Sequence, residues 1–311
     1  MTHLGPPKAR CYKSVLTLMG DEPSEFVAVQ KQCSLALYDN PPAGSSASAA
    51  PVVLLAHGLT LSHAMWESTV ETLSSSGFRC ITVDARGHGR SVPAGDIRSV
   101  PVETLFQDIL AVLKYLSHGN LDGKSLQVHF VGSSMGGFVG MRLAARYPWL
   151  LKSLTCVNTS CADEPSRRIS KLANALVLFQ HVPLMKGRLI AKAMQMLIGA
   201  SCGSKEFNDV KRIVDSVGSE AAKVARGVCD RAAIWDEAPF ARCGNVPIMY
   251  IHGEEDSSLP ITDARKSAEM LGVPPNRFVA VGKAGHTVPL EMPNLFGQHL
   301  LSFLRTVEQH H

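Results

Sequence analysis

The sequence predicts an α/β fold: a mostly parallel twisted sheet with helices on both faces and an inserted helical lid. Three observations favour this fold class. Short apolar runs recur along the chain, amphipathic helical patterns separate them, and one long helical stretch interrupts the alternation. Strands that are apolar at nearly every position fit a parallel sheet that is covered on both faces. With 311 residues, 45% of them apolar, the chain can bury a large core.

The N-terminal part of the chain predicts an antiparallel hairpin at the edge of the sheet. Residues Ser14–Leu18 and Phe26–Leu37 alternate apolar and polar side chains, which is typical of half-buried strands. Residues Asn40–Ala50 then have the Pro, Gly and Ser content of a surface loop.

Six apolar runs predict the strands of the main sheet. Helical patterns follow the first four of them, and the last two runs resume the sheet near the C-terminus. The runs are Val52–Ala56, Arg79–Asp84, Leu126–Gly132, Ser153–Asn158, Pro247–Ile251 and Phe278–Val281.

The helices between these strands follow from apolar spacing. Behind Pro101, which suits a first helical turn, apolar side chains repeat at helical intervals from Leu105 to Leu116. Further helices are expected at Phe138–Tyr147, around Asp263–Leu271 and in the last segment to about Val307.

A long helical stretch between about Cys161 and Arg242 breaks the alternation of strands and helices. We expect residues 1–160 and 243–309 to form a discontinuous core and residues 161–242 to form the lid. Apolar side chains of the lid, with two from the segment after the first core strand, are candidates for lining a substrate pocket, since Met and aromatic residues adapt to irregular apolar ligands. The alternative is that they only pack the lid on the core. The candidates are Met65, Trp66, Phe179, Met185, Met194 and Trp235.

Charge and composition exclude several classes of partner. The chain has 31 basic and 27 acidic residues, a net charge of +4, and no basic run of the kind that binds nucleic acid or anionic membranes. We expect a small-molecule partner.

The 8 cysteines are scattered without a Cys-x-x-Cys pair, which favours buried reduced thiols. The sequence shows neither a secretory signal nor an apolar run of the roughly 18 residues that span a bilayer, so we expect a soluble, cytoplasmic protein.

The strongest chemical signal is Gly132-Ser133-Ser134-Met135-Gly136, a G-x-S-x-G motif between a predicted strand and a predicted helix. In that context the turn presents Ser134 above the sheet as a nucleophile, and the amide of Met135 points to where an oxyanion would form. Gly132 and Gly136 remove the side chains that would collide in the turn. The alternative is a tight glycine turn without chemistry.

A serine hydroxyl needs a base, and the base needs an acid that fixes its tautomer. Asp256 and His286 follow the last two predicted strands, at the sheet edge where Ser134 lies, and in the order Ser, acid, His. We therefore predict Asp256 as the acid and His286 as the base. The neighbours Glu254 and Glu255 are alternatives for the acid, and a capping or surface role is the alternative for the histidine.

The loop after the first core strand, His57-Gly58-Leu59-Thr60, predicts a second oxyanion donor, the amide of Leu59. His57 is expected to fix this loop through its ring. Residues Asp84–Ser91 resemble a phosphate-binding glycine loop, but they lack its third glycine and the helix that should open on it, so they are read as a structural turn. We find no metal-ligand spacing, and we expect no cofactor.

Together these fragments resemble the α/β-hydrolase superfamily over about residues 50–308, and most closely its enol-lactonase and carboxylesterase-like branch. The resemblance implies a serine hydrolase that cleaves a carboxylic ester or lactone of a small, largely apolar substrate through an acyl-enzyme on Ser134. Two alternatives stay open. The same three residues would also serve carbon–carbon bond hydrolysis, peracid formation or acyl transfer, and the fold would also serve a ligand receptor with slow or no turnover.

Overall fold

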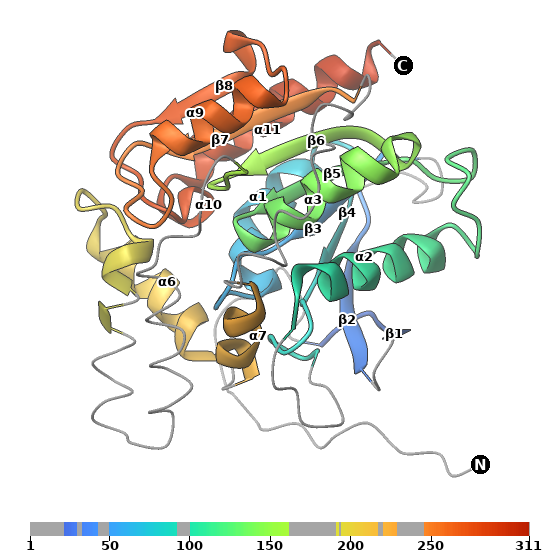
Figure 1. Ribbon diagram of the computed structural model, residues 1–311, viewed down its shortest axis with the longest axis horizontal. Helices are drawn as coiled ribbons and strands as arrows, with labels where there is room; N and C mark the ends of the chain where they lie inside the picture. The colour runs from blue at the N-terminus through green and yellow to red at the C-terminus, as the bar shows by residue number, and fades with distance from the viewer. Residues whose placement is uncertain are drawn as a thin grey trace.

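The structure is a computed structural model, and it describes residues 22–29, 33–42, 50–91, 100–161, 191–192, 194–216, 220–228 and 246–310. Its centre is an 8-stranded sheet with the order β1-β2-β4-β3-β5-β6-β7-β8 (Figure 1). The strands β3 to β8 are parallel to one another. At one edge, β2 pairs antiparallel with β4, and β1 pairs antiparallel with β2. The predicted parallel sheet with an antiparallel edge is confirmed.

The core strands lie where the apolar runs predicted them. The bounds of the strands are β1 Glu25–Val29, β2 Cys33–Asn40, β3 Val52–Ala56, β4 Arg79–Val83, β5 Val128–Ser133, β6 Leu151–Val157, β7 Ile248–Gly253 and β8 Phe278–Val281. Both ends of β3 and β8 match the prediction.

The edge hairpin differs from the prediction. Its two strands, β1 and β2, both come from the region that we predicted as one strand, and Val29 pairs with Cys33 across the reversal. The alternation of apolar and polar residues continues on both sides of the reversal, so the pattern alone does not reveal it. Ser14–Leu18, the other strand of the predicted hairpin, lies outside the described residues, as does most of the predicted surface loop.

Helices cover both faces of the sheet. On one face α2 packs on α3, and α3 packs on β5 and β6; on the other, α1 packs on α11. The bounds of these helices, and of the other helices outside the segment predicted as a lid, are η1 His63–Trp66, α1 Glu67–Ser74, α2 Val102–Leu116, α3 Met135–Arg146, η2 Pro148–Leu150, α9 Ile261–Met270, η4 Pro275–Arg277, α10 Val288–Glu291 and α11 Pro293–Glu308.

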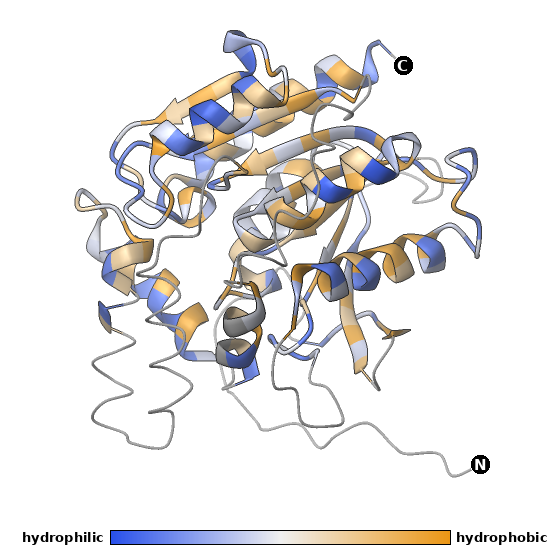
Figure 2. Ribbon diagram, viewed as in Figure 1, coloured by the Kyte–Doolittle hydropathy of each residue, from blue (hydrophilic) through white to orange (hydrophobic). Residues whose placement is uncertain are grey.

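Strand β3 shows how the sequence specifies these two layers. Its five residues are all buried, and alternate residues face opposite sides. Val52, Leu54 and Ala56 belong to the hydrophobic cluster that contains α2 and α3, whereas Val53 and Leu55 belong to the cluster that contains α1 and α11. Figure 2 shows the same pattern as largely orange strands between helices of mixed colour.

Two described helices, α6 (Ser204–Ser216) and α7 (Glu220–Val228), lie in the segment predicted as a lid and are drawn yellow to gold in Figure 1. Helix α6 packs against η1 and α10. In α7, Val224 lies next to Gly87, the residue four positions after β4. Both helices therefore contact segments that follow the carboxyl ends of sheet strands. Most of the predicted lid lies outside the described residues, and its division from the core stays a prediction.

No helix in the described part of the chain combines the length and apolarity that crossing a membrane requires.

Candidate active site

The turn between β5 and α3 has the geometry that the G-x-S-x-G motif predicts. Ser134 has φ 49° and ψ −110°, a strained conformation that costs about 1–3 kcal/mol and clusters at functional sites. A Cβ on Gly132 would lie 2.4 Å from the Gly136 carbonyl oxygen, and a Cβ on Gly136 would lie 2.3 Å from the Ala56 carbonyl oxygen. Only glycine fits at either position, so the turn is held tightly against β3.

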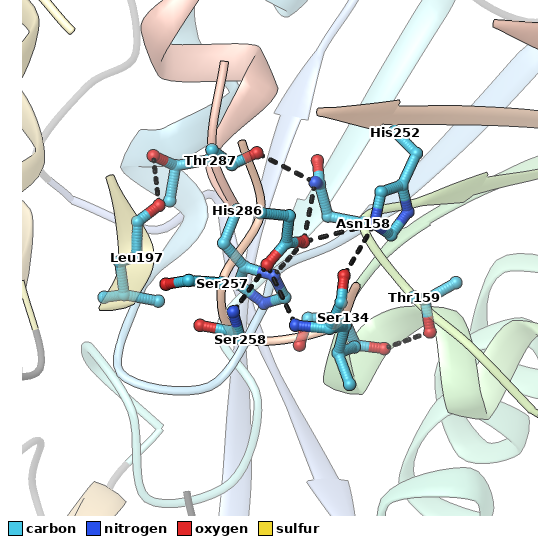
Figure 3. Close-up of polar contacts among 12 residues, drawn as sticks. Ser134, Asn158, Thr159, Leu197, His252, Ser257, Ser258, His286 and Thr287 are labelled. Carbon is cyan, nitrogen blue, oxygen red and sulfur yellow. Dashed lines mark hydrogen bonds and ion pairs between the residues drawn. The ribbon is translucent and has the colours of Figure 1, made fainter. Parts of the chain in front are cut away.

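Two loops at the same edge of the sheet bring Asp256 and His286 together. His286 Nδ1 donates to Asp256 Oδ2 over 2.7 Å, and both residues are buried. Because Nδ1 carries the proton that it donates to the carboxylate, Nε2 of the neutral ring has no proton and can accept one. Figure 3 shows His286 in one cluster with Ser134, from the segments that follow β8 and β5.

The Asp256 carboxylate accepts hydrogen bonds from other groups besides His286. The amides of Ser258 and Leu259 each donate to Oδ1 over 2.9 Å. His252 Nε2 lies 3.3 Å from Oδ2, and it also bonds the Leu259 carbonyl oxygen over 2.9 Å. Burial alone would raise the pKa of Asp256, but charge on His286 and hydrogen bonds from both histidines outweigh burial and hold the pKa well below its ordinary value. Asp256 is therefore ionised at neutral pH.

Asn158, which the sequence analysis did not single out, connects these loops. It follows β6 and is fully buried. Its Nδ2 donates to Asp256 Oδ2 and to the Gly285 carbonyl oxygen, each over 3.0 Å. Its neighbours bind the nucleophile turn, because Ser134 N donates to the Val157 carbonyl oxygen over 2.8 Å and Thr159 Oγ1 donates to the Ser134 carbonyl oxygen over 3.0 Å. The end of β6 thus joins the three segments that carry the predicted residues. Its position at the carboxyl edge was the available signal.

The loop predicted to donate the second oxyanion hydrogen bond lies beside Ser134. A Cβ on Gly58 would lie 3.4 Å from Ser134 Cβ. Leu59, the next residue, is half-buried in this loop. The Met135 amide begins α3, where the first N–H groups of a helix have no partner within it. Both predicted donor residues thus adjoin the serine.

Two histidines fix this loop to the turn after β4. His57 Nδ1 donates to the Gly58 carbonyl oxygen over 2.7 Å, and its Nε2 accepts from the Ala85 amide over 2.9 Å. His88 does the same in reverse: Nδ1 bonds the Arg86 carbonyl oxygen over 3.1 Å, and Nε2 accepts from the Thr60 amide over 3.3 Å. The expected fixing role of the His57 ring is confirmed.

The segment Asp84–Ser91 forms a compact turn, as predicted. Gly87 N donates to the Ser91 carbonyl oxygen over 2.8 Å, and Ser91 Oγ donates to the Asp84 carbonyl oxygen over 2.6 Å. The buried Asp84 carboxylate accepts from His63 and from the Tyr38 hydroxyl. Arg86 pairs with Asp108 through two hydrogen bonds of 2.9 and 2.6 Å. These polar side chains hydrogen-bond to other groups of the protein.

The predicted pocket residues differ in how much the structure describes. Phe179, Met185 and Trp235 lie outside the described residues. Met65, Trp66 and Met194 are at most 2% exposed and belong to one hydrophobic cluster on the α1 and α11 face of the sheet. Trp66 packs near Phe296, with ring centroids 6.1 Å apart. These three side chains contribute to the core, and a role in lining a pocket stays a prediction.

The described cysteines are free thiols. Cys33, Cys80, Cys156 and Cys161 are buried, and Cys202 is half-buried. Burial raises the pKa of the Cys80 thiol to about 12. Among the described residues, no group of His, Cys, Asp and Glu side chains is arranged to hold a metal ion.

The sequence matches a family model and several known proteins. A family model of the alpha/beta hydrolase fold matches residues 51–293. A relative from Agrobacterium fabrum, which its name assigns provisionally to the carbamate hydrolases as RutD, is 28% identical over 272 residues, 86% of this chain and 97% of the relative. 3-Oxoadipate enol-lactonase 1 of Acinetobacter baylyi is 25% identical over 264 residues, 83% of this chain and 90% of that protein.

A solved structure shows the same fold. A thermophilic esterase from Thermogutta terrifontis, with malate bound, has a TM-score of 0.73 and 23% identity, covering 91% of this chain and 98% of the esterase. The family model spans most of the chain, from just before β3 to the start of α11. The protein therefore belongs to the α/β-hydrolase fold family of enzymes.

Proposed function

We propose that this protein hydrolyses a carboxylic ester or lactone of a small, largely apolar substrate through an acyl-enzyme on Ser134. The observation that carries the proposal is the 2.7 Å hydrogen bond between His286 Nδ1 and Asp256 Oδ2, at the sheet edge where the strained Ser134 follows β5. A strained serine beside a histidine of fixed tautomer is the arrangement that nucleophilic acyl transfer requires. The names of the enol-lactonase and esterase relatives support the same substrate class.

The proposed reaction has two stages. Ser134 Oγ attacks the carbonyl carbon while its proton passes to His286 Nε2, and the amides of Leu59 and Met135 hold the oxyanion. The tetrahedral intermediate collapses, and the leaving alcohol takes the proton from His286. His286 then accepts a proton from water as the water oxygen attacks the acyl carbon. The second tetrahedral intermediate collapses to the acid, and Ser134 Oγ leaves with the proton that His286 returns. Asp256 stays ionised and stabilises the imidazolium.

The proposal is tested with a panel of p-nitrophenyl esters, enol-lactones and carbamates, together with a fluorophosphonate that labels activated serines. Ser134→Ala and His286→Ala should each reduce kcat by more than about 10³-fold, because nucleophile and base act as one unit. Ser134→Ala should also abolish labelling. Near-normal turnover by His286→Ala would contradict the proposal.

The two alternatives give different results in the same assays. Turnover of ring-cleavage diketones, or products that appear only with an acceptor alcohol or peroxide, would move the reaction to carbon–carbon hydrolysis, acyl transfer or peracid formation. Labelling of Ser134 without multiple turnover, together with ligand-dependent binding of a partner, would favour a receptor.

The segment predicted as a lid is proposed to line the part of the substrate pocket that holds the acyl group.

A further inference from the structure

A buried carboxylate lies behind the loop that carries His286. Glu291, the last residue of α10, is 5% exposed, and its carboxylate accepts four hydrogen bonds. Oε2 accepts from the amides of Gly199 and Gly285 over 2.8 and 2.9 Å. Oε1 accepts from the amide and the hydroxyl of Thr287 over 3.0 and 2.8 Å. Gly285 and Thr287 are the chain neighbours of His286, so Glu291 holds the histidine from both sides.

These four bonds use the whole acceptor capacity of the carboxylate, about two lone pairs on each oxygen. Within the described part of the chain, no lysine or arginine forms an ion pair with Glu291. Burying a carboxylate without a cation is costly unless hydrogen bonds replace the water, and bonds to an ionised acceptor are shorter and stronger than neutral ones. A glutamine at this position would have one acceptor oxygen, and its amide group would face two of the four donors.

The segment Leu197–Gly199 closes the other side of the same loop. The amide of His286 donates to the Leu197 carbonyl oxygen over 2.8 Å. A Cβ on Gly285 would lie 2.2 Å from the Gly199 amide nitrogen, so the two backbones are in direct contact. Glu291 bonds both of them. In Figure 3, Leu197 and Thr287 lie beside His286.

We propose that Glu291 is a positioning residue for the reaction. Its carboxylate clamps Gly285, Thr287 and the facing Gly199, and thereby holds the imidazole of His286 against Asp256 and toward Ser134. This inference rests on the proposed function and adds a residue that never contacts substrate. The competing explanation is a cap for the first turn of α10, which begins after Thr287. A cap would affect stability alone, whereas positioning affects the rate of the chemical step.

The test compares Glu291→Gln with Glu308→Gln, which removes a second hydrogen-bonded carboxylate at the opposite edge of the sheet. Glu308 accepts from Lys152 and His129. We expect Glu291→Gln to lower kcat for a p-nitrophenyl ester about 10- to 100-fold with little change in KM, because small displacements of a reacting group have effects of this size. Thr287→Val, which removes one of the four donors, should have a smaller effect in the same direction. Glu308→Gln should leave kcat unchanged.

A second readout does not depend on turnover. The His286 Nδ1 proton, bonded to Asp256, should give a downfield ¹H NMR resonance that is identified by its loss in His286→Ala. We expect this resonance to shift or broaden in Glu291→Gln and to persist in Glu308→Gln. An unchanged resonance in folded Glu291→Gln would overturn the inference, as would unchanged kcat in an active enzyme. Absence of esterase turnover in the unsubstituted protein, with the resonance altered by Glu291→Gln, would refute the proposed function and leave the positioning role standing.

Discussion

The side-chain amide of Asn158 and the main-chain carbonyl of Gly285 lie 3.0 Å apart, and the same amide nitrogen lies 3.0 Å from Asp256 Oδ2. One buried group therefore bonds both the predicted acid and the residue before the predicted base. Asn158 has φ 45°, in the left-handed region that asparagine tolerates better than most residues. The end of β6 is thus shaped to deliver this amide between two loops.

Replacing Asn158 with alanine should weaken both the fold and the reaction. The change leaves the Gly285 carbonyl oxygen without this donor and removes one of the hydrogen bonds to Asp256. We expect the free energy of unfolding in urea to fall by about 1–3 kcal/mol and kcat to fall about tenfold or more as the acid and base lose their alignment. Thr306→Val, which removes an exposed hydroxyl on α11, is the control. A kcat within twofold of the unsubstituted protein would refute the role of Asn158.

Two glycines near Ser134 should respond differently to a single added methyl group. Ala at position 136 would place Cβ 2.3 Å from the Ala56 carbonyl oxygen, a contact that backbone cannot relieve without moving. We expect Gly136→Ala to lose more than about 3 kcal/mol of stability or to fail to fold. Gly58→Ala meets Ser134 Cβ at 3.4 Å, an ordinary contact. Its melting temperature should stay near that of the unsubstituted protein, and equal melting of both variants would contradict the proposed geometry of the turn.

The sequence predicted the strands, the nucleophile turn and the Asp256–His286 pair because each has a local signature. Strand β3 is a short apolar run between turn residues, and the motif around Ser134 specifies its own backbone. Asn158 has only its position at the carboxyl edge of the sheet, and Glu291 has no such signature. Asn158 meets Gly285 across 127 positions, and Glu291 meets Gly199 across 92. Their roles depend on which segments the fold brings together, which a single sequence does not encode locally.

Acid should destabilise the protein from about pH 6.5 downward. Burial and the charge of His57 lower the pKa of His88 from 6.5 to about 3, and burial also lowers the pKa of His57. Between these values the unfolded chain binds protons that the folded chain does not, so stability present above pH 6.5 is lost as the pH falls. Each histidine contributes up to about 1.4 kcal/mol per pH unit. Asp84 and Asp256, whose pKa values are also lowered, add to the loss only below about pH 4.

Urea unfolding at pH 7.5 and pH 5.5 measures this dependence. We expect a lower free energy of unfolding at pH 5.5, and a smaller difference in His88→Gln, whose side chain does not titrate. Both rings accept an amide hydrogen bond at Nε2, so protonation also loosens the loop that carries Leu59. The same free energy at both pH values would contradict the assignment of neutral histidines.

A second serine–histidine–glutamate group offers a test of what makes the first one reactive. Ser153 Oγ lies 2.8 Å from His129 Nδ1, and His129 Nε2 lies 3.0 Å from Glu308 Oε1. These are the residue types of a hydrolytic triad, but Ser153 and His129 are 0% exposed, near the amino ends of β6 and β5. At 0% exposure the Ser153 hydroxyl is closed to a substrate. We therefore expect Ser153→Ala to keep full fluorophosphonate labelling and kcat within twofold, while Ser134→Ala loses both.

Ser153→Ala should lower the stability of the fold by about 1 kcal/mol, because it removes a buried hydrogen bond, and thermal unfolding measures this loss. Labelling that persists in Ser134→Ala and disappears in Ser153→Ala would identify Ser153 as the nucleophile and refute the proposed site.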